Sequence, residues 1–353
     1  MKGWIDFLGT QTKNYIVQYS KYGDWLTPSE VTIDEKLGRY FYKPISTPGE
    51  LVSTWFYALG TLLLSKVARI LGKTAEAEEY AKLFERIKEA FNKKFLKKDY
   101  YATGSQTSNL LPIYLDIVPE DRKEAVFKRL VENVEVIGSC HLGTGIAGTR
   151  YLFDTLTKYG RADLAYKLAT QTTYPSWGYM IREGATTVWE RWEYVTESSH
   201  DHPALGSIDS WLYKALAGIN VDPSAPGFER IIKPHIVGDL RHVSASINTI
   251  RGQISSSRRR EQDSLVLEVT LPVNTTGKVC IPVFGLKRPM IKEGGKVVWR
   301  DGAFVKGVPR IASAKQDDGY VTFDVGSGTY CSSFFMLNLE SRGRECSTIL
   351  LLF

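Results

Sequence analysis

Cysteine is scarce in this 353-residue chain, and its four residues lie far apart in the sequence. No two of Cys140, Cys280, Cys331 and Cys346 form a CxxC pair, which argues against a zinc site and against a disulfide scaffold. The pattern therefore predicts reduced, structural thiols, with no metal site and no cofactor.

Long apolar runs are also missing. No stretch approaches about 18 uninterrupted apolar residues, and by that criterion a membrane-spanning helix is excluded. Residues 1–17 contain neither an apolar signal core nor a small-residue cleavage site. We therefore expect a cytoplasmic protein without a membrane partner.

The excess of positive charge is small. The net charge is +6, and its densest cluster is Arg258–Arg260, between two strand-like runs. This cluster is interpreted either as a solvated hairpin tip or as a nucleic-acid patch, and its isolation favours the hairpin tip. No nucleic-acid partner is expected.

Helical periodicity dominates the first part of the chain. Residues 51–71 are apolar nearly all round, which predicts a buried helix, and Gly72 follows them as a C-terminal cap. Residues 74–95 carry one apolar stripe at helical spacing and predict an amphipathic partner. The same patterns predict further helices over residues 108–115, 120–134, 148–158, 161–171 and 207–218.

The composition changes after a linker with two prolines and a glycine, residues 220–231. Short alternating runs between residues 242 and 335, separated by turn residues, predict an antiparallel β-sandwich. The predicted domains are an α-helical domain over 1–222 and a β-sandwich over 223–337, followed by an atypical tail over 338–353.

Aromatic residues are concentrated in one stretch. Four Trp, four Tyr and two of the five His lie between Tyr174 and Tyr213, together with six carboxylates. Core packing rarely needs so many rings with polar groups beside so many acids, whereas a polar ligand with flat apolar faces does. Sugars are ligands of this kind.

Glu190 stands out within this stretch, in the segment Thr187-Val-Trp189-Glu-Arg-Trp192. A carboxylate between two indoles can gain proton affinity and a fixed position, which suits a general base. The alternative is a structural salt bridge between Glu190 and Arg191 or another arginine.

Two further motifs have competing interpretations. Residues 143–148 fit GxGxxG, but no apolar strand precedes them in a βαβ unit, so a tight inter-helix loop that lets a ligand approach the backbone is favoured over dinucleotide binding. His200 and His202 are two residues apart and cannot share a helix face, so hydrogen bonds to hydroxyl groups are favoured over a metal.

These motifs together resemble bacterial α-L-rhamnosidases of glycoside hydrolase family seventy-eight. The resemblance covers about residues 1–335 and rests on YGDWL at 22–26, YPSWGYMIREGATTVWERWE at 174–193, SHDHPALGSIDSWLYKALAGI at 199–219 and LPVNTTGKVCIP at 271–282. It implies a multidomain fold, α then β: an incomplete (α/α)6 barrel, or six-hairpin glycosidase domain, followed by an antiparallel β-sandwich. It also implies inverting hydrolysis of terminal α-L-rhamnosides, with a rhamnose-containing glycoside as partner.

The resemblance assigns roles residue by residue. Glu190 matches the family's general base, and His202 falls where the family has an Asn-His pair that contacts the sugar, although here the pair is Asp201-His202. Trp25 and Asp24 fall where the family has residues that line the same sugar pocket. The expected sugar-binding residues are thus Asp24, Trp25, Trp177, Trp189, Trp192 and His202.

One departure from the family pattern limits the expected activity. The acidic, Arg-containing block that holds the family's general acid does not occur in this sequence. We expect impaired hydrolysis, and self-association through a barrel face that lacks its opening helices. The alternative functions are a non-catalytic carbohydrate-binding remnant and a helical adaptor, and the crowded rings and acids of residues 174–213 speak against the adaptor.

Overall fold

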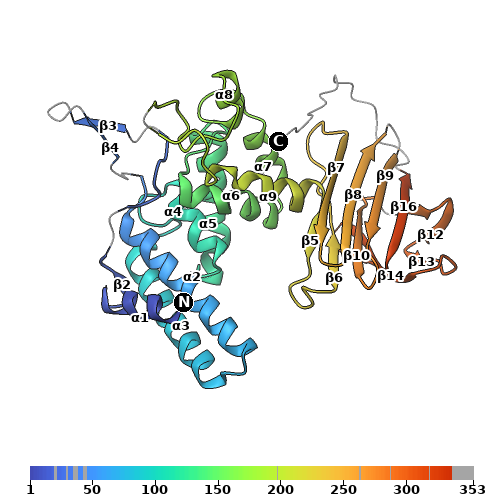
Figure 1. Ribbon diagram of the computed structural model, residues 1–353, viewed down its shortest axis with the longest axis horizontal. Coiled ribbons are helices and arrows are strands. Elements are labelled where there is room, and N and C mark those ends of the chain that lie inside the picture. The colour runs from blue at the N-terminus through green and yellow to red at the C-terminus, as the bar shows by residue number, and fades with distance from the viewer. Residues whose placement is uncertain are drawn as a thin grey trace. The chain divides into compact units, whose positions relative to one another are not determined.

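The computed structural model describes residues 1–19, 22–28, 31–34, 39–42, 46–196, 198–261, 264–286, 288–317 and 319–335, and for residues 31–34, 39–42, 334 and 335 the backbone alone. The chain forms two compact units, Met1–Ile208 and Asp209–Phe353 (Figure 1). The expected tail over 338–353 lies outside the described residues.

The first unit is helical. Its α-helices are α1 (Lys2–Thr10), α2 (Gly49–Ile70), α3 (Thr74–Phe95), α4 (Gln106–Tyr114), α5 (Glu120–Glu132), α6 (Ile146–Lys158), α7 (Ala162–Ala169) and α8 (Trp177–Arg182). Two short hairpins, β1 (Thr12–Lys13) with β2 (Ile16–Val17) and β3 (Val31–Asp34) with β4 (Arg39–Tyr42), lie between α1 and α2. The helix α9 (Ile208–Trp211) and a π-helical turn, Leu212–Leu216, follow.

The apolar period found in the sequence places α2 to α7 within a few residues, whereas the expected helix over 207–218 is divided into α9 and a π-helical turn, and α8 was not predicted. Helix α3 buries Tyr80, Phe84, Ile87 and Phe91, which are spaced at three and four residues and form its apolar stripe. Gly72 adopts a φ of +73° just past α2, a conformation that favours glycine and ends the helix.

Helix α2 corrects one inference from the sequence. Its length and composition would allow it to cross a membrane, so the absence of an uninterrupted apolar run was too strict a criterion for exclusion. More than half of its most apolar window is buried within the structure.

The second unit contains two sheets (Figure 1). One has the order β14-β15-β10-β6-β5, and the other has the order β13-β12-β11-β16-β9-β8-β7. Their bounds are β5 (Ile219–Val221), β6 (Glu229–Ile232), β7 (His242–Thr249), β8 (Gly252–Arg260), β9 (Ser264–Leu271), β10 (Thr276–Pro282), β11 (Met290–Glu293), β12 (Lys296–Arg300), β13 (Ala303–Phe304), β14 (Ile311–Asp317), β15 (Tyr320–Val325) and β16 (Gly328–Phe335).

Alternation along the strands builds the core of this unit. Strand β9 buries Leu265, Leu267, Val269 and Leu271, every second residue, against apolar side chains of the five-stranded sheet such as Phe323. The sheets are mostly antiparallel, with a parallel pair between β6 and β10. The expected helical domain followed by a β-sheet domain is confirmed.

The arginine cluster differs from the expected hairpin tip. Strand β8 continues through Arg260, and Arg258 is buried. Its Nε donates to the Leu216 carbonyl at 3.2 Å, and its Nη1 lies 3.4 Å from the Leu240 carbonyl. The guanidinium therefore belongs to the interior of the second unit, because backbone carbonyls supply its partners.

Two isoleucines of the seven-stranded sheet test this packing. Ile254 is 1% exposed in the core, whereas Ile250, in the turn of the same hairpin, is 98% exposed. Ile254→Ala should lower the free energy of unfolding by about 2–5 kcal/mol through lost apolar contact and a cavity. Ile250→Ala should change it by no more than about 0.5 kcal/mol. Urea denaturation measures both, and equal effects would contradict the assigned core.

Candidate active site

Two segments of the loop after α8 run side by side. The His202 amide donates to the Val188 carbonyl at 2.9 Å, and the Glu190 amide donates to the Ser199 carbonyl at 3.0 Å. The Ser199 amide in turn donates to Glu190 Oε2 at 3.3 Å. The structure therefore brings Glu190 and His202 together on two backbone segments that hold each other in place.

Three rings pack inside this loop. Trp189 and Tyr194 have ring centroids 5.3 Å apart, Tyr194 stacks on His200 at 4.7 Å, and Trp189 lies 5.8 Å from His200. The Trp189 side chain is buried. It therefore packs against the protein, which differs from the sugar contact expected from the sequence.

Glu190 and His202 both keep partial exposure to solvent. The Ala204 amide donates to His202 Nδ1 at 3.3 Å, so in the neutral imidazole this nitrogen is the acceptor and Nε2 carries the proton. His202 can thus donate a hydrogen bond through Nε2, and the Glu190 carboxylate can reach water.

Trp192 anchors the motif in the helical unit. It is 0% exposed, and its Nε1 donates to the Thr144 carbonyl at 2.9 Å. Its ring meets Trp177 edge to face at 5.2 Å, and Trp177 is buried with its Nε1 on the Leu205 carbonyl at 3.2 Å. Neither indole occupies the ligand-facing position expected from the sequence, because both are used to hold the loop.

Asp24 lies in the interior. Its side chain is 0% exposed, and it accepts hydrogen bonds from the Thr107 hydroxyl and from the amides of Gly145, Ala147 and Gly148, the last three at 2.8, 2.8 and 3.1 Å. Burial raises the pKa of Asp24, and these hydrogen bonds oppose that rise. The carboxylate caps the N-terminus of α6, which differs from the pocket wall expected for it.

The GxGxxG segment is explained by this cap. A Cβ on Gly145 would lie 2.1 Å from the Trp25 carbonyl oxygen, and one on Gly148 would lie 2.3 Å from Thr107 Oγ1. Glycine is needed at both positions because the chain's own loop approaches the helix terminus. The tight inter-helix loop is observed, with Asp24 and Trp25 in the place where a ligand was expected.

Trp25 is partly exposed to solvent. Its backbone carbonyl accepts from the Ile146 amide at 2.8 Å, and its ring meets Tyr22 edge to face at 4.6 Å. The side chain is half-buried. Of the expected tryptophans of the pocket it is the one that retains substantial surface, so its stacking on a sugar stays a prediction.

The sequence analysis missed a buried polar run at the start of α4. Gln106, Thr107, Ser108 and Asn109 are all buried. Gln106 Oε1 accepts from the Gly143 amide at 2.8 Å, and its Nε2 donates to the His141 carbonyl at 3.1 Å. The available signal was Ser105, a helix cap, directly before four polar residues and an apolar run.

Within the described residues no group of three or more His, Cys, Asp or Glu could hold a metal ion. Of the described cysteines, Cys140, Cys280 and Cys331 are free.

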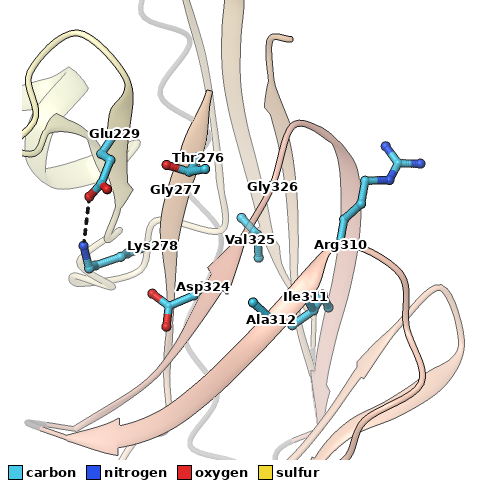
Figure 2. A pocket seen from close by; sticks show the side chains of 10 residues that line it. All are labelled: Glu229, Thr276, Gly277, Lys278, Arg310, Ile311, Ala312, Asp324, Val325 and Gly326. Atoms are coloured by element: carbon cyan, nitrogen blue, oxygen red, sulfur yellow. Dashed lines mark hydrogen bonds and ion pairs between the residues drawn. The ribbon is translucent and has the colours of Figure 1, made fainter. Parts of the chain in front are cut away.

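A separate cavity of about 510 Å³ lies in the second unit, over β6, β10, β14 and β15 (Figure 2). None of its ten lining residues is aromatic, and its charged groups include Glu229, Lys278, Arg310 and Asp324. No ring in this lining could stack on a sugar face.

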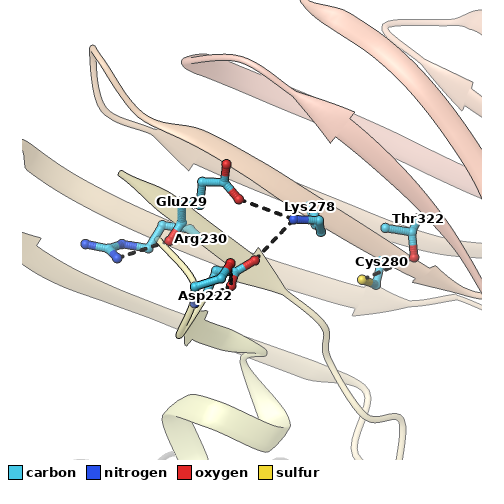
Figure 3. Close-up of polar contacts among 7 residues, drawn as sticks. Asp222, Glu229, Arg230, Lys278, Cys280 and Thr322 are labelled. Atoms are coloured by element: carbon cyan, nitrogen blue, oxygen red, sulfur yellow. Dashed lines mark hydrogen bonds and ion pairs between the residues drawn. The ribbon is translucent and has the colours of Figure 1, made fainter. Parts of the chain in front are cut away.

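Lys278 is engaged by carboxylates of the same sheet. Its Nζ lies 3.1 Å from Asp222 Oδ2 and 3.3 Å from Glu229 Oε2 (Figure 3). The pKa of Asp222 is lowered to about 2, first by hydrogen bonds from the Ser224 hydroxyl and amide and then by the hydrogen bond from Lys278. The polar groups on this face therefore satisfy one another.

The chain belongs to the family of bacterial α-L-rhamnosidases. Residues 1–216 match the bacterial alpha-L-rhamnosidase 6 hairpin glycosidase domain, and residues 218–296 match the bacterial alpha-L-rhamnosidase C-terminal domain. The resemblance inferred from the sequence is confirmed, and the helical unit belongs to a six-hairpin glycosidase domain.

Named relatives and solved structures agree. The chain is 35% identical over 294 residues to an alpha-L-rhamnosidase of Formosa agariphila, covering 80% of this chain and 31% of the relative, and 30% identical over 338 residues to one of Streptomyces avermitilis, covering 93% and 29%. The structure of alpha-L-rhamnosidase from Dictyoglumus thermophilum has a TM-score of 0.84 at 39% identity, covering 95% of this chain and 36% of that one. The Streptomyces avermitilis enzyme complexed with L-rhamnose has a TM-score of 0.78 at 29% identity, covering 94% and 30%. The chain thus spans about a third of the length of these relatives.

Gly145 and Gly206 provide a matched test of the helix cap. Gly145 has a φ of −99°, which alanine adopts, so Gly145→Ala should destabilise through the clash with the Trp25 carbonyl, by about 1–3 kcal/mol. A Cβ on Gly206 would meet nothing within 4 Å, and Gly206→Ala should change stability by no more than about 0.5 kcal/mol. Thermal unfolding followed by circular dichroism measures both, and an unaffected Gly145→Ala protein would contradict the close approach.

Proposed function

We propose that this chain provides the base half of an inverting glycoside hydrolase that releases terminal α-L-rhamnose, with Glu190 as general base. The observation that carries the proposal is the Glu190 position: its backbone is bonded to Ser199, buried Trp189 and Trp192 flank it, and its carboxylate is half-buried. The names of the relatives support the reaction class.

The chemistry follows from this geometry. Glu190 takes a proton from a water molecule while the water oxygen bonds to the anomeric carbon, and the bond from that carbon to the leaving oxygen breaks on the opposite face. A general acid protonates the leaving oxygen, and in inverting enzymes it stands about 6.5–9.5 Å from the base. We assign no residue of this sequence to that acid.

Two further residues have proposed contacts with the sugar. His202 Nε2–H can donate to a hydroxyl, since Nδ1 is used by the Ala204 amide. The half-buried Trp25 ring offers an apolar face for stacking. The solved relative complexed with L-rhamnose supports a rhamnoside as the ligand class.

An aryl rhamnoside tests the base without an acid. The 2,4-dinitrophenolate of 2,4-dinitrophenyl α-L-rhamnoside leaves without a proton, so the chain should hydrolyse it with inversion, and proton NMR should show the β-anomer of rhamnose first. Glu190→Gln should lower kcat by at least ~10²-fold with little change in KM, because the variant keeps size but loses the proton acceptor.

Glu193 is the matched control, three residues away and accepting from the Tyr174 hydroxyl at 3.3 Å. Glu193→Gln should keep turnover near the parent value. If Glu190→Gln keeps its turnover, the salt-bridge interpretation of Glu190 is supported instead. If the parent binds L-rhamnose without hydrolysing the aryl rhamnoside, the carbohydrate-binding alternative is supported.

Self-association is also part of the proposal, through a stripe on α2. Phe56, Leu63, Val67 and Ile70 lie on one helix face and are 39% to 84% exposed. Helix α1 packs against α2 at Gly60, where Ile5 lies, and it carries two further exposed rings, Trp4 and Phe7. A patch of this kind marks an interface, and a second copy of the chain is the proposed occupant.

Sedimentation velocity over a range of concentrations tests this association. The parent should form a dimer or a larger species, and Val67→Lys should shift it toward the monomer by placing a charge in the interface. Val221→Lys, an exposed valine of the second unit, should leave the association unchanged. A parent that stays monomeric at all concentrations would contradict the interface.

A further inference from the structure

One peptide group joins Asp24 to the Glu190 motif. The amide of Gly145 donates to Asp24 Oδ2 at 2.8 Å, and the carbonyl of Thr144, on the other side of the same peptide bond, accepts from Trp192 Nε1 at 2.9 Å. Trp192 lies two residues after Glu190. The carboxylate of a distant loop is therefore two hydrogen bonds away from the anchor of the proposed base.

The position of this peptide depends on Asp24 at several points. Asp24 Oδ1 holds the amides of Ala147 and Gly148, and the adjacent Trp25 carbonyl holds the amide of Ile146. The first amides of α6 thus all find partners in residues 24 and 25, and the helix dipole favours the negative charge there. Moving the carboxylate would release the whole turn.

The charge of Asp24 also strengthens the Trp192 bond. A hydrogen bond from an amide to a carboxylate is charge-assisted, and it polarises the amide so that its carbonyl becomes a better acceptor. Thr144 and Trp192 are both 0% exposed, so water does not compete for this bond. An uncharged side chain at position 24 would weaken it.

We propose that Asp24 is a positioning residue for Glu190, acting through the Thr144–Gly145 peptide and Trp192. It has no surface for a ligand, so it affects the base only through this connection. The catalytic part rests on the proposed function, because an enzyme loses up to about 10²-fold in rate when a distant change misplaces a reacting group by about 1 Å.

The indole N–H signals of a ¹⁵N-labelled protein test the connection without any activity. Trp192→Phe keeps an aromatic ring without the donor and identifies the Trp192 signal as the one that disappears. In Asp24→Asn, an amide NH₂ replaces one acceptor, so the Trp192 indole proton should shift and exchange with solvent about tenfold faster, as for a weakened hydrogen bond. Asp222→Asn, the control in the second unit, should change neither.

Thr107→Val covers the case in which Asp24→Asn does not fold. It removes the hydroxyl donor to Oδ2 and keeps the carboxylate, so a smaller change in the same Trp192 signal is expected. A folded Asp24→Asn protein with an unchanged Trp192 signal would overturn the proposal, as would an unfolded one together with an unchanged Thr107→Val protein.

Kinetics on 2,4-dinitrophenyl α-L-rhamnoside test the consequence for Glu190. Asp24→Asn and Trp192→Phe should each lower kcat by about tenfold or more with little change in KM, and the double variant should be no slower than the slower single variant. If Asp24 only stabilised the fold, Asp24→Asn would leave kcat unchanged at temperatures below its unfolding transition. If the parent shows no hydrolysis, the proposed function fails. The NMR result still tests whether Asp24 and Trp192 are connected through the Thr144–Gly145 peptide.

Discussion

The buried carboxylate of Asp24 holds three segments of the helical unit against one another: its own loop, α4 and the first turn of α6. A charge without access to water needs hydrogen bonds at both oxygens, and Asp24 obtains them from α4 and from the first turn of α6. This requirement explains why residue 107 carries a hydroxyl and why residues 145 and 148 are glycines. Segments that are 83 to 124 residues apart in the sequence are thereby fixed against one another.

The helices could be predicted because the features that determine them, apolar spacing and end caps, lie within each segment. The stripe of α3 and the φ of Gly72 follow from neighbours within the same segment, and the predicted bounds of residues 74–95 equal those observed. The strands β7, β9, β10, β15 and β16 follow from alternation for the same reason. Helix α8, six residues long, offers too few turns for a period to be recognised.

Contacts between residues far apart in the sequence could not be predicted from the sequence. Arg258 is one of three adjacent arginines, and its burial depends on the carbonyls of Leu216 and Leu240, 42 and 18 residues away. The parallel pairing of β6 with β10 likewise has no signal in either strand alone. The family motifs pointed to Glu190, whose role as general base stays a prediction. They also named the aromatic residues around it, but not the direction in which each side chain points.

Tryptophan shows why orientation was the difficult step. Sugar stacking and loop anchoring both need a large flat ring with a polar end, so the residue type does not separate them. The indole N–H does separate them: in Trp177 and Trp192 it is bonded to a backbone carbonyl inside the fold, which buries the ring with it. A carboxylate on a loop must be held within a fraction of an ångström to act on a water molecule, and a loop lacks the ladder of hydrogen bonds that would do this in a helix or strand. The two buried indoles fix the loop that carries Glu190, and this explains why Trp177 and Trp192 use their aromatic surface for contacts within the protein.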